Sequence, residues 1–302
     1  MPQHVLVSGA SGLIGSALAH QLRSSGYRVT ALVRHRAGEQ EITWDPSVGR
    51  LDLAPAGRID AVVHLAGENI AARWTASRMA RIRNSRTEGT RLLSTAIGRL
   101  DPKPRVLVSA SAIGIYGNRG DENLTETSPL GDPRNFLVSI AREWEAAAEP
   151  ARAQGIRVVH PRFGIVLSTA GGALKKMLPV FRLGLGGRLG TGAQWMSWIA
   201  IDDAVGVIVH AFHDNTLGGP VNATAPEPVT NAEFTRRLGE ALGRPTPFPV
   251  PAAALRLAFG KMAEGTILAS ARVLPSRLQQ TGYRFVDPEL SGALRHLLAQ
   301  PN

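Results

Sequence analysis

Three glycines at three-residue intervals, Gly9, Gly12 and Gly15, are the first residues of this 302-residue chain whose spacing suggests chemistry. They follow a short apolar run that ends at Ser8, and an apolar, helix-forming segment begins at Ser16. A glycine turn between a strand and a helix lets the backbone approach a pyrophosphate, and the helix start directs free N–H groups at that anion. The pattern predicts a dinucleotide site, with an ordinary packing turn as the alternative.

A basic position follows the next predicted strand, Arg28–Val33, which ends at Arg34 with Arg36 just beyond. In dinucleotide folds an acidic side chain at the end of this strand holds the ribose 2′-hydroxyl, whereas arginine suits a 2′-phosphate. Arg34 therefore favours NADP(H) over NAD. An exposed arginine without a ligand is the alternative.

A sheet must position these residues, and the rest of the chain shows the pattern of one. Residues 60–67 are predicted to form a strand that is apolar on both faces, as a buried parallel strand is. Alternating strands and helices predict an α/β fold with a doubly wound parallel sheet. Further strands are predicted over 42–45, 105–111 and 156–160, helices over 75–98 and 135–149, and loops over 120–133 and 161–164.

Beyond Ser168 the chain becomes rich in glycine, above all over residues 184–192. Embedded leucines and tryptophans indicate an ordered binding loop rather than a low-complexity linker. Further on, Asp202 and Asp203 begin a predicted helix and are interpreted as caps rather than catalysts, because the helix dipole favours carboxylates there. A capping box over residues 230–233 opens another helix.

Composition excludes several function classes. The chain has no cysteine, which excludes disulfides, thiolate metal sites and cysteine nucleophiles, and no metal site is expected. No basic-then-apolar leader is apparent, and charged residues interrupt the apolar stretch over 251–274. We therefore expect a cytoplasmic protein without a membrane partner.

The net charge is +10, from 34 Lys and Arg against 24 Asp and Glu. Most of the excess is arginine scattered along the chain, and the arginines of the helix over 75–98 lack interleaved aromatic residues. Nucleic acid is therefore not an expected partner. A small-molecule ligand, anionic in character, or a composition bias of the host explains the charge. The oligomeric state stays open.

With these elements placed, the chain resembles the extended short-chain dehydrogenases/reductases. Within them it is similar to the NADP-binding, nucleoside-diphosphate-sugar-epimerase-like family that carries its own small C-terminal domain. The resemblance covers nearly the whole chain. The motifs that carry it are SGASGLIGSAL (8–18), LAGENI (65–70), NSR (84–86), SASAIGIYG (109–117), the block over 171–203, TNAEF (230–234) and the tail over 251–298.

The resemblance implies a Rossmann-type domain over 1–170 and about 199–220, and a smaller, mostly helical substrate domain over 171–198 and 221–302. It also implies NADP(H) across the strand ends. Five residues would then surround the pyrophosphate: Gly9, Ser11, Gly12, Leu13 and Ile14. Arg34 would meet the 2′-phosphate, Leu65 and Ala66 would pack along the adenosine half, Arg86 would reach the cofactor from its helix, and Val166 would lie near the nicotinamide.

One departure from the family pattern affects catalysis. Short-chain dehydrogenases use a tyrosine, a lysine four residues later, and a serine to pass a proton while hydride moves. At the matching positions this chain has Phe136 and Ile140, neither of which exchanges protons. Ser111 stays a candidate for the serine. Tyr116 is the nearest phenol in sequence, without an identifiable lysine partner.

Two hypotheses follow for the function. The first is an NADPH-dependent oxidoreductase or epimerase-like enzyme, in which Ser111 and Tyr116 polarise the oxygen of a carbonyl or sugar-like substrate. The second is a catalytically silent NADP(H)-binding sensor or regulatory protein, which the missing tyrosine and lysine favour.

Overall fold

A nine-stranded sheet organises the computed structural model, which describes residues 4–299. The strands pair in parallel except for the antiparallel pair at one edge, β3 with β4. Across the sheet they follow the order β13 (Gly219–Ala223), β9 (Arg157–Phe163), β6 (Val106–Ser109), β5 (Ala61–His64), β1 (His4–Ser8), β2 (Arg28–Val33), β3 (Glu41–Asp45) and β4 (Arg50–Leu51), while β7 (Ser111–Ala112) pairs with β9.

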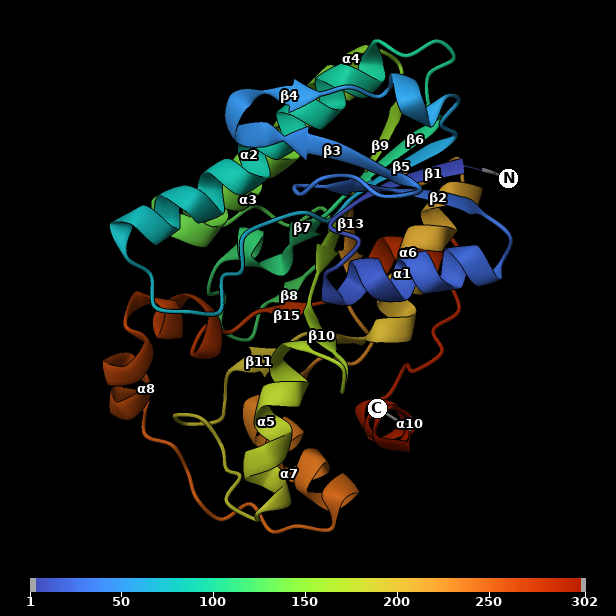
Figure 1. The fold of residues 1–302 in the computed structure, drawn as a ribbon. Helices are drawn as coiled ribbons and strands as arrows, with labels where there is room; N and C mark the ends of the chain where they lie inside the picture. Colours follow the sequence, from blue (N-terminus) through green and yellow to red (C-terminus); the bar gives the residue numbers. More distant parts are fainter. Residues whose placement is uncertain (1–3, 300–302) are drawn as a thin grey trace.

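Helices cover both faces of this sheet (Figure 1). Successive side chains of a strand point to opposite faces, so Val5 and Val7 of β1 join one apolar cluster and Leu6 joins another. The first cluster includes residues of α1 (Leu13–Ser24) and α6 (Ile201–His213), and the second includes residues of α2 (Ala76–Gly98). Two shorter helices, α3 (Phe136–Ala146) and α4 (Glu149–Ala153), contact α2.

The strand order reverses beside β1. The chain passes from β1 through α1 to β2 on one side, and β5 later pairs with the other side of β1. In open α/β sheets, ligands bind outside the carboxyl ends of the strands at such a switch point. The predicted Rossmann-type fold is confirmed, and the glycine turn lies at its switch point.

The C-terminal half adds helices and three small sheets beside the main one (Figure 1). Side chains of three of these helices share one buried apolar cluster, which includes Leu174, Phe234 and Leu294. The strand pairs are β10 (Ile165–Leu167) with β12 (Trp198–Ala200), β11 (Trp195–Met196) with β14 (Val229–Thr230), and β15 (Arg272–Val273) with β8 (Asn123–Leu124). The helices are α5 (Gly172–Arg182), α7 (Asn231–Leu242), α8 (Ala252–Phe259), α9 (Ser276–Gln280) and α10 (Leu290–Ala299), with short helical turns over 46–48, 54–56, 113–116 and 263–267.

The structure corrects three local predictions. The predicted loop over 120–133 contains β8, and the predicted helix over 135–149 is two helices, with a break after Ala146. Residues 161–163, predicted as a loop, continue β9, because Pro161 pairs in register with Val221 of β13. The predicted domain boundaries stay a prediction, and the terminal residues 1–3 and 300–302 of those ranges lie outside the described residues.

Between residues 4 and 299, no helix combines the length and the apolar character that crossing a membrane requires.

Candidate functional site

The turn after β1 is tight because the end of β5 approaches it closely. Gly9 has a φ of +73°, in the left-handed region that favours glycine. A Cβ on Gly9 would lie 2.8 Å from the carbonyl carbon of Leu65 and 2.8 Å from the backbone nitrogen of Ala66. This position therefore admits glycine alone without a shift of the backbone.

The other two glycines shape the start of α1. The backbone N–H of Gly12 donates to the Gly9 carbonyl at 3.0 Å, and a Cβ on Gly15 would lie only 2.1 Å from that same oxygen. Among residues 4–299, no side chain accepts a hydrogen bond at the N-terminal end of α1, and the first turn of this helix contains no acidic residue. Because the first N–H groups of a helix have no partner within it, this end can receive an anion beside the exposed Ser11 and Gly12.

Arg34 follows the last residue of β2 and is exposed. Its guanidinium makes no hydrogen bond or ion pair with any residue between 4 and 299. Since β2 and β1 are parallel neighbours with Ser8 opposite Leu32, their carboxyl ends lie at the same edge of the sheet. The structure therefore places an uncompensated positive charge at the strand end predicted to meet a 2′-phosphate.

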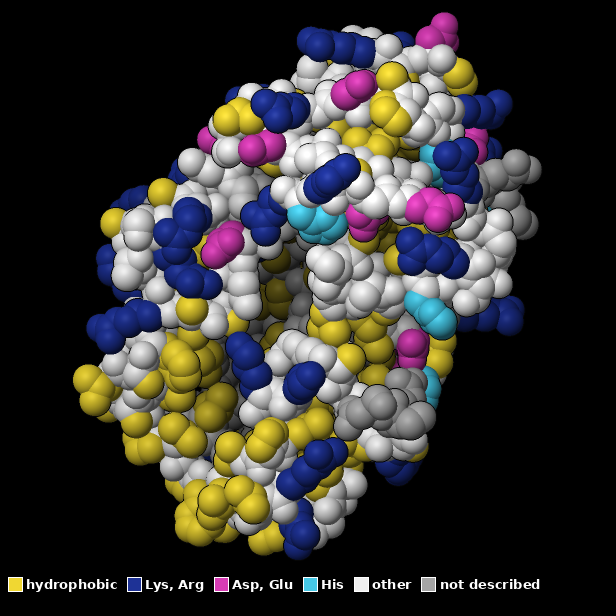
Figure 2. All heavy atoms as spheres, in the orientation of Figure 1, with side chains coloured by type: hydrophobic (Ala, Val, Ile, Leu, Met, Phe, Trp, Pro, Cys, Tyr) yellow, Lys and Arg dark blue, Asp and Glu magenta, His cyan; other side chains and the backbone are white. Residues whose placement is uncertain are grey.

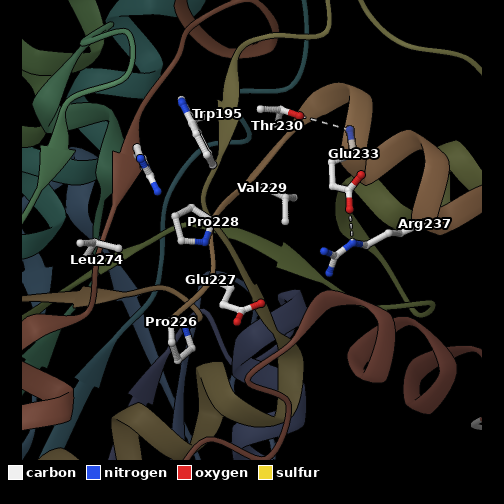
Figure 3. Close-up of a pocket in the computed structure, with 10 residues that line it drawn as sticks. Trp195, Pro226, Glu227, Pro228, Val229, Thr230, Glu233, Arg237 and Leu274 are labelled. Carbon is white, nitrogen blue, oxygen red and sulfur yellow. Dashed lines mark hydrogen bonds and ion pairs between the residues drawn. The ribbon is translucent and has the colours of Figure 1, made fainter.

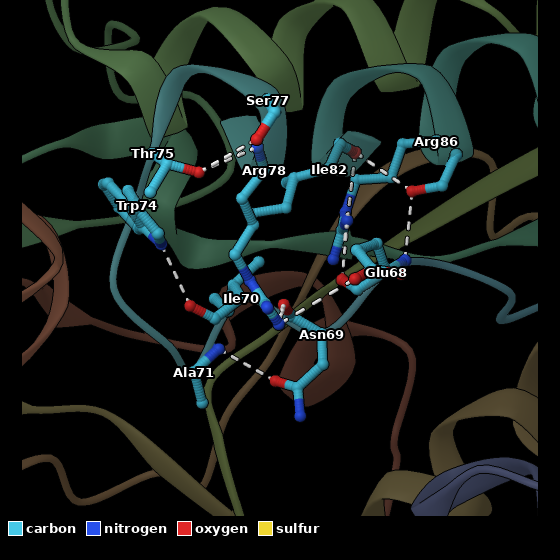
Figure 4. Close-up of polar contacts among 11 residues, drawn as sticks. Glu68, Asn69, Ile70, Ala71, Trp74, Thr75, Ser77, Arg78, Ile82 and Arg86 are labelled. Carbon is cyan, nitrogen blue, oxygen red and sulfur yellow. Dashed lines mark hydrogen bonds and ion pairs between the residues drawn. The ribbon is translucent and has the colours of Figure 1, made fainter. Parts of the chain in front are cut away.

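The segment over residues 65–75 is tied to α2 by polar contacts (Figure 4). The backbone N–H of Glu68 donates to Ser85 Oγ at 3.0 Å, and Arg86 Nη1 donates to the Glu68 carbonyl at 3.0 Å. Arg78 Nη2 lies 3.8 Å from Glu68 Oε1. These contacts hold the half-buried backbone that was predicted to lie along the adenosine.

Arg86 is half-buried beneath this segment. Its Nη1 also donates to the Ile82 carbonyl at 3.1 Å, and its Cζ lies 4.9 Å from the centroid of the Trp144 ring. A Cβ on Gly67 would lie 3.2 Å from the same Cζ. Burial lowers the pKa of Arg86 to about 10, and the charge of Glu68 opposes that shift. Arg86 thus positions the segment after β5, and its predicted contact with a cofactor stays a prediction.

A buried histidine lies below the glycine turn. His64 Nδ1 is 2.5 Å from Ser8 Oγ, and the Trp44 ring packs edge-on at 5.9 Å. Burial, with a smaller contribution from the charge of Arg86, lowers the pKa of His64 to about 4. His64 is therefore neutral at physiological pH and adds no charge beneath the candidate anion site.

The connection between β10 and α5 lies against the first turn of α1. A Cβ on Gly171 would lie 3.0 Å from the Leu13 side chain, and one on Gly172 would lie 3.2 Å from Leu13 and 3.3 Å from the Val166 carbonyl. Val166, predicted at the nicotinamide end, pairs with Ile199 of β12. The structure therefore brings Val166 near the start of α1.

Five polar side chains form a buried network near the ends of β7 and β9. Ser111 Oγ donates to Glu145 Oε1 at 2.7 Å, and Arg162 holds the same carboxylate through two hydrogen bonds of 2.8 and 2.9 Å. Arg162 Nη1 donates to the Tyr116 hydroxyl at 2.9 Å, and this hydroxyl donates to Asn222 Oδ1 at 2.7 Å.

This network does not support the predicted catalytic roles of Ser111 and Tyr116. Both are buried, and Tyr116 has no exposed surface. Burial raises the pKa of Tyr116, against the opposing charge and hydrogen bond of Arg162. Burial would raise the pKa of Glu145 too, but the hydrogen bonds and charge of Arg162 lower it overall. Both hydroxyls donate to fixed partners, so neither presents a free proton to a substrate.

The two positions predicted to match the family's tyrosine and lysine make apolar contacts. Phe136 begins α3 and packs edge-on against Trp74, with ring centroids 5.0 Å apart. A Cβ on Gly265 would lie 2.9 Å from the Trp74 ring, and Ile140 is buried. The contact of Trp74 with Phe136 and Gly265 could not be predicted from the sequence, because a contact between distant segments leaves no local pattern.

The sequence also did not predict the ion pair of Glu145 with Arg162. They lie on α3 and β9, and no spacing in the sequence links them. The only available signal was an arginine inside an apolar run, which the sequence analysis placed in a loop.

One group of potential metal ligands is present among residues 4–299: Asp202, Asp287 and His296. His296 Nδ1 lies 2.8 Å from Asp287 Oδ2, so two of the three already form a hydrogen bond with each other. The neighbouring Asp203 accepts from the backbone N–H groups of Val286 and Asp287 at 2.8 and 2.9 Å. Asp203 thus fastens the C-terminal tail rather than capping its own helix.

Figure 2 shows a hollow in the molecular surface between the region of α1 and that of α5. Hydrophobic side chains lie at the bottom of this hollow, and Lys and Arg side chains lie around it. The start of α1 lies beside this hollow in the view of Figure 1. The candidate anion site is therefore next to a space that can admit a small molecule.

Comparison with known proteins agrees with this architecture. The family model described as the NAD dependent epimerase/dehydratase family matches residues 5–223, and a model described as a domain of unknown function (DUF1731) matches residues 250–297. The epimerase family protein Mb2239 of Mycobacterium bovis is 42% identical over 299 residues, which cover 98% of each chain.

Two solved structures are also similar. The human epimerase family protein SDR39U1 (isoform2), crystallised with NADPH, has a TM-score of 0.89 and 38% identity, over 97% of this chain and 98% of that one. The nucleoside-diphosphate sugar epimerase from Corynebacterium glutamicum has a TM-score of 0.82 and 36% identity, over 99% of this chain and 58% of that one.

Proposed function

The chain belongs to the NAD dependent epimerase/dehydratase family, and from this membership we propose that it is an NADPH-dependent oxidoreductase or epimerase-like enzyme. Its substrate would be a small molecule with a carbonyl or sugar-like group. The human relative, solved with NADPH, supports the choice of cofactor.

The start of α1 carries this proposal. Gly9 and Gly15 let the turn and the helix pack closely, while Gly12 keeps the helix end exposed and without a capping side chain. A pyrophosphate at this end would accept hydrogen bonds from the free N–H groups of the first turn. Its contacts would come from Ser11, Leu13 and Ile14 as well as the glycines.

Arg34 supports NADPH over NADH. Its exposed guanidinium has no ion-pair partner within residues 4–299, so a 2′-phosphate would supply one. Leu65 and Ala66, fixed by the contacts of the following segment with α2, would flank the adenosine. Val166 would lie toward the nicotinamide, and Arg86 would act through the segment that it holds.

The bound nicotinamide would supply the hydride. The described residues would bind and orient it, and the hollow beside α1 would admit the substrate. We assign no proton transfer to Ser111 or Tyr116, because their hydroxyls are committed to Glu145 and Asn222. The proton for the substrate oxygen would then come from solvent or from another group.

A second candidate function is a catalytically silent NADP(H)-binding sensor or regulatory protein. The observation that favours it is the packing of Phe136 against Trp74 and the burial of Ile140, where the family pattern places its proton-transferring pair.

Deuteride transfer separates the two functions. NADPH labelled with deuterium at the transferable position is mixed with the protein and a panel of aldehydes, ketones and keto sugars, and products are read by mass spectrometry. The enzyme hypothesis predicts label in at least one product, and less label with the Gly12→Ala variant when NADPH is below saturation. Tight NADPH binding without transfer to any carbonyl compound would favour the sensor instead.

A further inference from the structure

A cavity of about 360 Å³ lies between β11, β14, the start of α7 and β15 (Figure 3). Its size suits a small ligand with a ring and one acidic or polar group. None of the residues proposed to hold NADPH lines it. The lining residues are Trp195, Pro226, Glu227, Pro228, Val229, Thr230, Glu233, Arg237, Arg272 and Leu274.

Arg272 carries an uncompensated positive charge in this lining. The Arg272 guanidinium lies over the Trp195 ring, 4.2 Å from the centroid, and its Nε is buried without a hydrogen-bond partner. No ion pair of Arg272 occurs among the residues the structure describes. The other lining arginine, Arg237, differs because its Nε donates to Glu233 Oε1 at 2.6 Å. A buried guanidinium atom without a partner is costly unless an anion completes its contacts.

The ring beneath Arg272 is fixed in place. Trp195 Nε1 donates to Asp121 Oδ1 at 2.8 Å, and the Trp195 backbone N–H donates to Ser270 Oγ at 3.0 Å. Its strand also pairs with β14. A guanidinium stacked on a fixed indole is ordered before a ligand arrives, so less conformational entropy is lost on binding.

Apolar side chains supply the rest of the wall, with Pro228 near the middle, Pro226 at the lower edge and Leu274 at one side in Figure 3. Prolines are rigid and offer flat surfaces for a ring. Glu227 is exposed, and its carboxylate has no hydrogen bond or ion pair within residues 4–299. Glu227 would repel a second acidic group of the ligand, so the lining suits a ligand with a single acidic group.

We infer that this cavity is a second ligand site, which binds a small aromatic acid through Arg272. The acid is a carboxylate or a phosphate, and the ring packs on the proline and leucine wall. This inference does not depend on the cofactor site, because the two sites share no residue.

Calorimetric titration of the full chain with benzoate and with phenyl phosphate tests the inference. We expect at least one to bind with a Kd of about 1 mM or lower, and benzyl alcohol, which lacks the acid, to bind at least about tenfold more weakly. The compound with the lower Kd shows whether the site prefers a carboxylate or a phosphate. Absence of binding by both acids would overturn the inference.

Variants locate the binding. Arg272→Gln should weaken binding of the acid at least about tenfold. Arg244→Gln, at an exposed arginine after α7, should leave the Kd of the acid unchanged. Glu227→Gln should strengthen binding, because it removes a repelling charge without disturbing the core. Equal affinity of the wild type, Arg272→Gln and Glu227→Gln would contradict the assignment even if Arg272→Gln proves less stable.

Saturation with NADPH separates this site from the start of α1. The acid should bind equally well with and without NADPH, and the Trp195 indole N–H resonance, identified by its loss in Trp195→Phe, should shift on titration. Loss of acid binding when NADPH is present would place the acid at the cofactor site and overturn the inference. A protein that fails to bind NADPH would overturn only the proposed function.

Discussion

Phe136 and Trp74 pack edge to face, with ring centroids 5.0 Å apart and an interplanar angle of 62°. This contact joins the start of α3 to the segment that follows β5, and that segment carries Leu65 and Ala66. Phe136, which is predicted to stand at the position of the family's tyrosine, thus holds the segment that follows β5 against α3.

Replacing Phe136 tests this role. Phe136→Ala should lower the free energy of unfolding by about 3 kcal/mol, since it removes a packed ring, whereas Phe136→Tyr should change it by less than about 1 kcal/mol. Urea unfolding followed by circular dichroism measures both. Phe136→Tyr should also bring no hydride transfer, because Ile140 supplies no lysine. A gain in transfer would show that this position faces the reacting atoms.

Tyr116→Phe should act on stability alone. It leaves Asn222 Oδ1 and Arg162 Nη1 each short of a hydrogen bond inside the protein, at a cost of about 1–3 kcal/mol in the free energy of unfolding. NADPH affinity should stay within about twofold of wild type. If the variant instead kept its stability and lost hydride transfer, Tyr116 would regain the catalytic role that its burial argues against.

The three glycines can be separated by alanine substitution. Gly15→Ala should lower the free energy of unfolding by about 3 kcal/mol or more, because the new Cβ would lie 2.1 Å from the Gly9 oxygen. Gly12→Ala meets that oxygen at 3.3 Å, so the fold should survive while NADPH binds about tenfold or more weakly. Thermal melts and titrations of both variants check this. Unchanged NADPH affinity in folded Gly12→Ala would speak against a pyrophosphate at α1.

His64 should make stability depend on pH. Burial, with the charge of Arg86, lowers its pKa from 6.5 to about 4, so the unfolded chain takes up a proton first as the pH falls. The stability contributed by neutral His64 is complete above about pH 6.5 and is lost between there and about pH 4, on the order of 3 kcal/mol.

Urea unfolding at pH 7 and pH 5 measures this loss. His64→Leu should flatten the pH dependence, whereas His20→Gln, at an exposed histidine of α1, should keep the wild-type slope. An identical slope in His64→Leu would show that another group is responsible.

The sequence predicted the part of the site that local signals define. A strand, a glycine turn and a helix are contiguous from His4 to Ser24, and Arg34 follows the next strand directly. Parallel pairing of β1 with β2 then brings those pieces to one sheet edge, as the fold class requires.

The buried network could not be predicted in this way. Glu145 and Arg162 meet because α3 crosses beside β9, and Asn222 joins them from β13, 60 residues beyond Arg162 in the sequence. Such pairings depend on tertiary packing and leave no periodic signal. The hydrogen bond of the Tyr116 hydroxyl to Asn222 could not be predicted for the same reason, and a catalytic role for Tyr116 stays a prediction.

The helix α5 escaped prediction for a local reason. Its start at Gly172 and Pro179 in its interior both oppose helix formation, yet Leu174, Leu178 and Phe181 are buried together on one face. Tertiary packing of that face outweighs the unfavourable propensities.

The choice of cofactor rests on Arg34. Arg34→Ala should weaken the binding of NADPH by about ten- to a hundredfold, because a charge-assisted contact with the 2′-phosphate is lost. The affinity for NADH should stay unchanged. Arg28→Ala removes an exposed arginine at the opposite end of the same strand and should change neither affinity.

Titration calorimetry of NADPH and NADH with the wild type, Arg34→Ala and Arg28→Ala tests the central claim most directly. The account predicts tighter binding of NADPH than of NADH by the wild type and by Arg28→Ala, and near-equal binding by Arg34→Ala. Equal affinity of the wild type for the two cofactors, or failure to bind either, would contradict it.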